Sequence, residues 1–198
     1  MRRLVLLAVS ILVLAGPAAA QVPQAQAPPA PEPIILGPPP PPATALEAFH
    51  AAPGAILTVA YEDLGDVAGV FVEAREMRDT GGARVRGVVV TIPEKRETVP
   101  DQAFIDPDEL PALLKGFDAL LAITTSPNGE FRNFDMRFST KGELVLTASS
   151  TRQRGVVYGV EVGRLLRTRR SLNGGEFHQL RVLVEAAQQK LATLRDDR

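Results

Sequence analysis

The sequence predicts a single α+β domain, in which an antiparallel meander sheet of about six or seven strands carries one mid-chain helix and a C-terminal helix. Runs of alternating or β-branched residues, separated by glycine- and aspartate-rich turns, indicate hairpins. Two segments with apolar residues at i, i+3, i+4 and i+7 indicate helices that each bury one face. Strands and helices in separate runs are typical of the α+β class. The pattern leaves open whether the sheet closes into a barrel.

The N-terminal residues 1–20 have the organisation of a secretory signal peptide. Arg2 and Arg3 supply a short basic region, and an apolar run over residues 4–15 follows it. Residues 18–20 are small, as a cleavage site requires, and the apolar run is shorter than the about 20 residues of a membrane span. We therefore expect a periplasmic or secreted protein with no transmembrane span after cleavage. Retention of the segment as an anchor is the alternative.

Residues 21–44 are rich in proline, alanine and glutamine, and they end in the proline run 38–42. This composition lacks the apolar side chains of a core and favours extended polyproline II structure. It predicts a disordered linker that holds a domain over residues 45–198 at a distance from its surroundings.

Composition excludes several classes of chemistry. The chain contains no cysteine, which excludes disulfides, thiol catalysis and thiolate metal sites. It has 22 basic and 23 acidic residues, and loss of Arg2 and Arg3 leaves 20 and 23, a net charge of about −3. A negative total does not favour nucleic acid as a partner. No cofactor motif occurs, so we expect no cofactor.

The first half of the domain reads as a three-stranded meander with strands at residues 56–62, 70–77 and 83–92. Turn chemistry at residues 64–66 and 79–82 separates them. Residues 98–105 form at most an edge strand, because Pro93 and Pro100 interrupt this region.

The mid-chain helix is predicted from an apolar face that consists of Leu110, Leu113, Leu114, Phe117, Leu120 and Leu121. We expect Asp108, rather than Asp106, as its N-cap, because this choice places Pro111 inside the first turn. Residues 126–129 then form the exit turn.

A second meander follows, with predicted strands at residues 134–138, 143–148, 156–162 and 164–172 and a turn at residues 140–142. Residues 173–175 open the last helix, residues 176–194. Its apolar positions are Phe177, Leu180, Val184, Ala187, Leu191 and Leu194. We expect this face to pack on the sheet. The same spacing fits a coiled-coil seam, so a homo-oligomer joined through residues 180–191 is the alternative.

The acidic helix opening at residues 105–110, the lysine-glycine turn at residues 140–142 and the closing amphipathic helix resemble an uncharacterised family of small secreted bacterial proteins of unknown function. The resemblance covers residues 45–194. It implies a shared fold and export, and it assigns no functional residue.

Few residues carry recognisable chemistry. His50 and His178 lack the short ligand spacing of a zinc site, and the serines and threonine of residues 149–151 have no nucleophile motif around them. The cluster of acidic side chains consists of Asp101, Asp106, Asp108 and Glu109. Such oxygens suit calcium, but helix capping already accounts for Asp108.

The strongest candidate site is a late cluster of basic side chains: Arg152, Arg154, Arg164, Arg167, Arg169 and Arg170. Arg167 and Arg169 would share one strand face, and together the cluster would suit phosphate or carboxylate groups. The alternative is a sheet edge protected by charge. We expect an exported, non-enzymatic binding or interaction module with an envelope or extracellular partner, and the basic cluster would suit an anionic one. The alternatives are a hydrolase with a site built from Asp, Glu or Ser, and the structural homo-oligomer.

Overall fold

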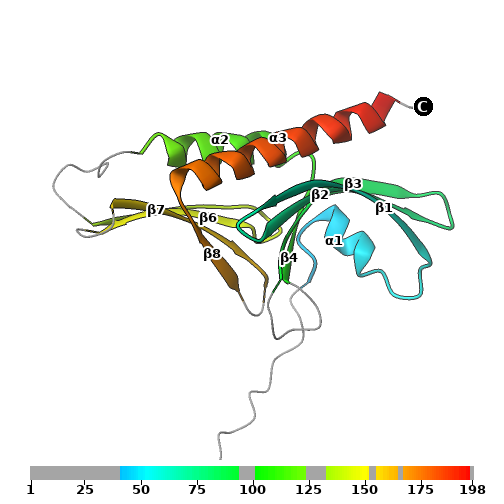
Figure 1. Ribbon diagram of the computed structural model, residues 1–198. Coiled ribbons are helices and arrows are strands. Elements are labelled where there is room, and N and C mark those ends of the chain that lie inside the picture. The colour runs from blue at the N-terminus through cyan, green and yellow to red at the C-terminus, as the bar shows by residue number, and fades with distance from the viewer. Residues whose placement is uncertain (1–40, 94–100, 124–132, 152–154, 165–166, 197–198) are drawn as a thin grey trace, which may run out of the picture. The chain divides into compact units, whose positions relative to one another are not determined.

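The alternating and β-branched runs form eight strands, but these divide into two open sheets (Figure 1). The computed structural model describes residues 41–93, 101–123, 133–151, 155–164 and 167–196. Each sheet consists of four antiparallel strands, of which the two outer ones are edge strands. Neither sheet closes into a barrel within these residues. The expectation of one sheet of six or seven strands is therefore wrong, whereas the α+β class is confirmed.

Sheet A has the order β1-β2-β3-β4, with β1 (Leu57–Val67), β2 (Val70–Asp79), β3 (Arg84–Ile92) and β4 (Asp101–Ile105). The predicted strands are present, and β4 is an edge strand as expected. The turn predicted at residues 64–66 is wrong. A register shift between Asp63 and Gly65 lets β1 continue, and the chain reverses at Ala68 and Gly69, whose φ angles of 51° and 79° suit a two-residue hairpin.

Sheet B has the order β5-β6-β7-β8, with β5 (Phe134–Ser139), β6 (Val145–Thr151), β7 (Gly155–Val162) and β8 (Thr168–Leu172). The predicted turn at residues 140–142 is confirmed, because Thr140 exchanges hydrogen bonds with Leu144. The last strand begins at Thr168 and not at residue 164. Gly163 has a φ of 103°, which ends the extended backbone of β7.

Helix α2 (Leu110–Leu121) buries the predicted apolar face, but its N-cap position is Glu109 and not Asp108. The Asp108 carboxylate instead accepts a hydrogen bond from Lys141 Nζ at 3.0 Å. The prediction failed because a partner 33 residues away in the sequence holds the carboxylate. The predicted exit turn at residues 126–129 lies outside the described residues.

A short helix that the sequence did not predict, α1 (Ala45–His50), opens the described fold. The Asp106 carboxylate accepts hydrogen bonds from the backbone N–H groups of Ala45 and Leu46 at 2.8 and 3.1 Å. Helix α1 lies on the face of sheet A opposite α3 (Figure 1), and its Leu46 is fully buried against Met77 and Val89. Six residues are too few for a helical period to be recognised in a sequence.

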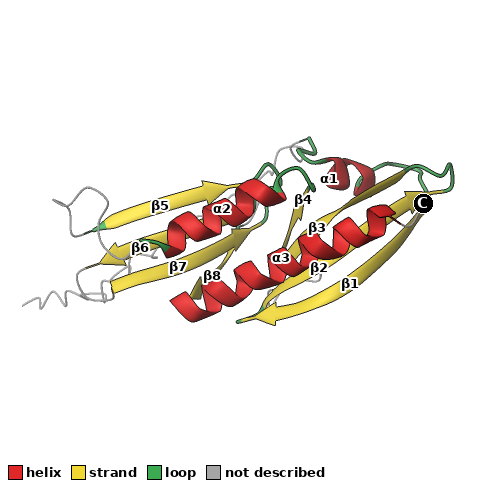
Figure 2. Cartoon of the chain, turned by 90° about the horizontal axis from the view of Figure 1, so that it is seen from above, coloured by secondary structure: helices red, strands yellow, loops and turns green. Residues whose placement is uncertain are grey.

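Helix α3 (Gly174–Asp196) begins with a capping box, in which Asn173 and Glu176 each accept a hydrogen bond from the other's backbone N–H. It packs on β1, β2 and β3 of sheet A and on β7 and β8 of sheet B, while α2 packs on β5, β6 and α3 (Figure 2). The α3 residues that this packing buries are Phe177, Leu180, Val184, Ala187 and Leu191. The expected packing of this face on the sheet is confirmed, so the face is not available as an exposed seam.

One hydrophobic core runs beneath α2 and α3 and across both sheets. Aromatic rings mark its centre, where Phe177 lies 4.9 Å from Phe117 and 4.7 Å from Tyr158 between ring centroids. The described residues belong to one compact unit, residues 38–198.

Candidate functional site

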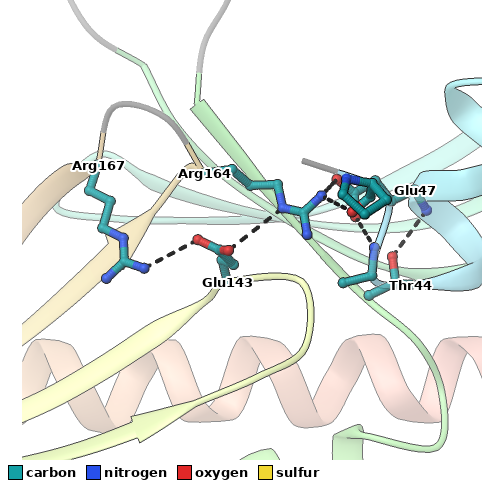
Figure 3. Close-up of polar contacts among 7 residues, drawn as sticks. Thr44, Glu47, Glu143, Arg164 and Arg167 are labelled. Atoms are coloured by element: carbon teal, nitrogen blue, oxygen red, sulfur yellow. Dashed lines mark hydrogen bonds and ion pairs between the residues drawn. The ribbon is translucent and has the colours of Figure 1, made fainter. Parts of the chain in front are cut away.

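Arg164 and Arg167, two members of the predicted basic cluster, lie in a network of carboxylates (Figure 3). Arg164 Nη1 donates to Glu47 at 3.0 Å and to the carbonyl of Pro41 at 2.6 Å. Its Nε lies 3.6 Å from Glu143, which also accepts a hydrogen bond from Arg167 at 3.2 Å. The network connects the start of α1 to the turn that precedes β6. Both guanidinium groups therefore stabilise the fold.

The remaining described arginines of the cluster point elsewhere. Arg169 lies 3.4 Å from Glu161, its direct partner on β7, whereas Arg170 donates to the carbonyl of Pro93 at 2.9 Å. Arg167 precedes the first residue of β8, so, contrary to expectation, it does not share a strand face with Arg169. Successive strand residues face opposite sides of a sheet, so Arg169 and Arg170 do not share a face either. Arg152 and Arg154 lie outside the described residues. Each described guanidinium therefore has a protein partner, and anion binding by the cluster stays a prediction.

The acidic cluster is also used within the fold. Asp101 accepts a hydrogen bond from the Thr168 hydroxyl at 2.5 Å, and Glu109 accepts one from the Lys141 backbone N–H at 2.7 Å. The hydrogen bond from Lys141 lowers the pKa of Asp108. In the part of the chain that the structure describes, no group of three or more acidic or histidine side chains is placed to hold a metal ion. The calcium alternative therefore receives no support.

The two histidines lie in different elements. His50 is the last residue of α1, and the centroid of its ring lies 5.5 Å from that of the Phe104 ring. His178 lies in the first turn of α3. Across the described residues, no hydrogen bond links either ring to Ser149 or Ser150. Neither serine is therefore paired with a histidine base in the described residues, and the hydrolase alternative with a site built from Asp, Glu or Ser stays a hypothesis.

The feature that stands out is the edge of sheet A at β1. Residues 58–63 are exposed without interruption. Of the four large apolar side chains exposed among the described residues, Ile56, Val59 and Tyr61 lie on or beside β1, with 73, 40 and 67% of their area exposed. Residues 56–61 carry no charge and no proline. Edge strands are normally protected by such residues, so this stretch is open to pairing with another strand.

A recess of about 310 Å³ lies beside this edge, on the face of sheet A that α3 covers. Ala60 and Ala74, neighbouring small residues of β1 and β2, leave room beneath the last turns of the helix. Leu194 and Lys190 of α3 form the opposite wall. A side chain of an added strand would find an apolar floor here.

The charges at the rim of the recess are paired. Lys190 forms an ion pair with Glu62, and the nearly buried Glu76 accepts hydrogen bonds from Arg78 and Arg86. Burial raises the pKa of Glu76, but the hydrogen bonds from the two arginines outweigh it and hold this pKa below its ordinary value. With these charges neutralised, the recess favours an apolar group over an ion.

The sequence predicted the strand at residues 56–62 but not its position at the edge of a sheet. The signal was present, because the letters ILTVAY form a six-residue run of high β-propensity without charge. Only the strand order shows that this run lies at an edge.

No family model, curated protein or solved structure matches the chain. None of the helices in the described residues is both long enough and apolar enough to cross a membrane.

Proposed function

We propose that this chain is an exported, non-enzymatic interaction module, which binds an extended polypeptide segment by adding it as a strand to the edge of β1. The N-terminal segment with the order of a signal peptide supports the export, and the proline-rich segment that follows supports presentation on a tether. The observation that carries the binding proposal is the exposed, uncharged edge over residues 58–61 of β1.

Strand addition uses the backbone of the edge strand. The outward-facing N–H and C=O groups of β1 have no neighbouring strand in the described part of the sheet, so a partner segment would supply their hydrogen bonds. Val59 and Tyr61 project from the same face and would cover apolar side chains of the added strand. The recess beside Ala60 would take a side chain on the other face.

The experiment uses a fluorescent synthetic peptide with the sequence of residues 56–63 as the extended probe. Its binding to the full chain is measured by fluorescence polarisation, and hydrogen exchange of the outward-facing β1 amides is followed in parallel. We expect saturable binding, slower exchange in β1, and at least about a tenfold weaker affinity for the variant Val59→Lys, because a charge at this position opposes strand addition.

Val182→Lys is the matched control, since Val182 is also an exposed valine, with 46% of its area exposed, but lies on α3. A peptide of the same composition in scrambled order controls for non-specific adhesion. The proposal is overturned if neither the peptide nor a raised chain concentration slows exchange in β1, or if Val59→Lys and Val182→Lys bind the peptide equally.

A further inference from the structure

We propose that the strand added to β1 is β1 of a second copy of this chain, so that two copies of sheet A form one continuous sheet about a twofold axis at Ala60. This inference rests on the proposed function, because it names the partner of the same edge. It follows from the length of the regular part of β1, from the pairing that a twofold axis imposes, and from the state of the other edge of sheet A.

The regular part of β1 has an identifiable midpoint. Leu57 to Asp63 pair one-to-one with residues of β2, and the register shift that follows Asp63 ends this regular run. Two identical strands that pair antiparallel along the whole run must place its midpoint, Ala60, opposite itself. Alanine is the smallest side chain in the run, so the two copies can approach closely at the axis.

The axis at Ala60 brings compatible side chains together. Val59 falls opposite Tyr61 of the second copy, and symmetry makes this pair twice. Both side chains are exposed in the single chain, so the pairing would cover exposed apolar surface of Val59 and Tyr61. On the other face Thr58 falls opposite Glu62 of the second copy. No two carboxylates face each other, so no like-charge repulsion opposes this register.

The other edge of sheet A does not offer a second site for growth. Strand β4 has five residues, and the turn of residues 140–142 lies against it. A Cβ on Gly142 would come within 1.7 Å of the Phe104 oxygen. With β4 covered, twofold pairing at β1 limits the growth of sheet A to two copies.

The first test is the mass of the full chain in solution, measured by light scattering during size-exclusion chromatography over a range of concentrations. We expect the mass of two chains for the unaltered protein and for Val182→Lys, and a twofold fall to one chain for Val59→Lys. Tyr61→Lys, at a position with 67% of its area exposed, serves as a second variant, and circular dichroism verifies that each variant is folded.

The second test fixes the register. The chain has no cysteine, so a single introduced cysteine can form a disulfide only with the same cysteine of a second chain. Ala60→Cys should give a disulfide-linked dimer on mild oxidation, because directly opposed residues lie within disulfide reach. Val59→Cys should cross-link several-fold less, since in this register the residues 59 of the two chains are diagonal neighbours, about 7–8 Å apart. Val182→Cys should form no disulfide-linked dimer, because residue 182 lies on α3, away from the paired strands.

The outcomes separate the two proposals. A chain that stays single at all concentrations but binds the peptide of residues 56–63 overturns the second copy as partner and leaves strand addition standing. A dimer that persists in Val59→Lys and Tyr61→Lys, with no cross-link in Ala60→Cys, overturns the inference because it uses another surface. Failure of both peptide binding and dimer formation overturns the inference and the proposed function together.

Discussion

Val59 and Met77 are direct cross-strand partners, yet Met77 is fully buried whereas 40% of Val59 is exposed. The difference arises because Leu46 of α1 packs onto Met77 and Val89 and leaves the outermost strand exposed. Burial of one partner and exposure of the other locate the boundary of the core. Beyond that boundary lies the edge that we assign to strand addition.

Asp106→Ala should destabilise the protein by about 1 kcal/mol, because two backbone N–H groups at the start of α1 lose their acceptor. Asp108→Ala should leave stability unchanged, since its partner Lys141 is an exposed side chain. Urea unfolding followed by circular dichroism measures both. Equal midpoints for the two variants would contradict the role of Asp106.

Gly142→Ala should destabilise the fold by about 1–3 kcal/mol or more, because its Cβ would lie 1.7 Å from the Phe104 oxygen and would force the turn away from β4. Gly174→Ala is the matched control. Its Cβ would meet only a Tyr158 ring atom at 3.6 Å, and it lies in the first turn of α3. Thermal unfolding should show a lower midpoint for Gly142→Ala alone, and a lower midpoint in both variants would refute the close approach.

Glu76→Gln should lower the free energy of unfolding by about 1–3 kcal/mol at pH 7, because it removes a charged acceptor of Arg78 and Arg86. The folded pKa of Glu76 is lowered, so its contribution is complete above the ordinary value of 4.5 and is lost as the pH falls through the folded value. Urea unfolding between pH 7 and pH 3 should therefore show the two proteins converging in acid.

The control for this measurement is Glu185→Gln, which removes the same charge from a pair with Arg181 one turn away on α3, where the Glu185 side chain is 41% exposed. It should cost about 0.5 kcal/mol or less. A difference between unaltered protein and Glu76→Gln that stays constant down to pH 3 would contradict the assigned contribution.

Arg164→Gln should destabilise the protein by about 1.5–3 kcal/mol, because it leaves Glu47 and Glu143 without their shared cation at a site with little solvent access. Arg167→Gln should have little effect, since its side chain is 43% exposed. Chemical unfolding measures both changes. An equal loss in the two variants would contradict the larger contribution assigned to Arg164 in the network of Figure 3.

Local chemistry predicted much of the fold. The two hairpin turns at residues 79–82 and 140–142 were found because glycine, aspartate and threonine stabilise them within a few residues. The apolar faces of α2 and α3 were found because the helical period repeats over several turns. The failures involve partners distant in sequence. Asp106 and Asp108 each bind groups far along the chain, so the choice of N-cap could not be settled locally.

The candidate site was predicted less well than the fold. The basic cluster was read from its charge, but the carboxylates that neutralise Arg164, Arg167 and Arg169 come from α1, the turn before β6, and β7. A sequence shows the number of charges in a segment and does not show which of them meet. The β1 edge was missed for a related reason, since an uncharged strand reads the same at the centre of a sheet and at its edge.

By itself, the sequence determined the α+β class, the positions of most strands and both long helices, because periodicity and turn chemistry act over short distances. It also determined the absence of thiol chemistry. Only the tertiary structure decided that the strands divide into two sheets, that α3 packs on both of them, and that Val59 is left exposed. These outcomes depend on which apolar surfaces pack against each other in the core, and the surfaces that pack together belong to segments far apart in the chain.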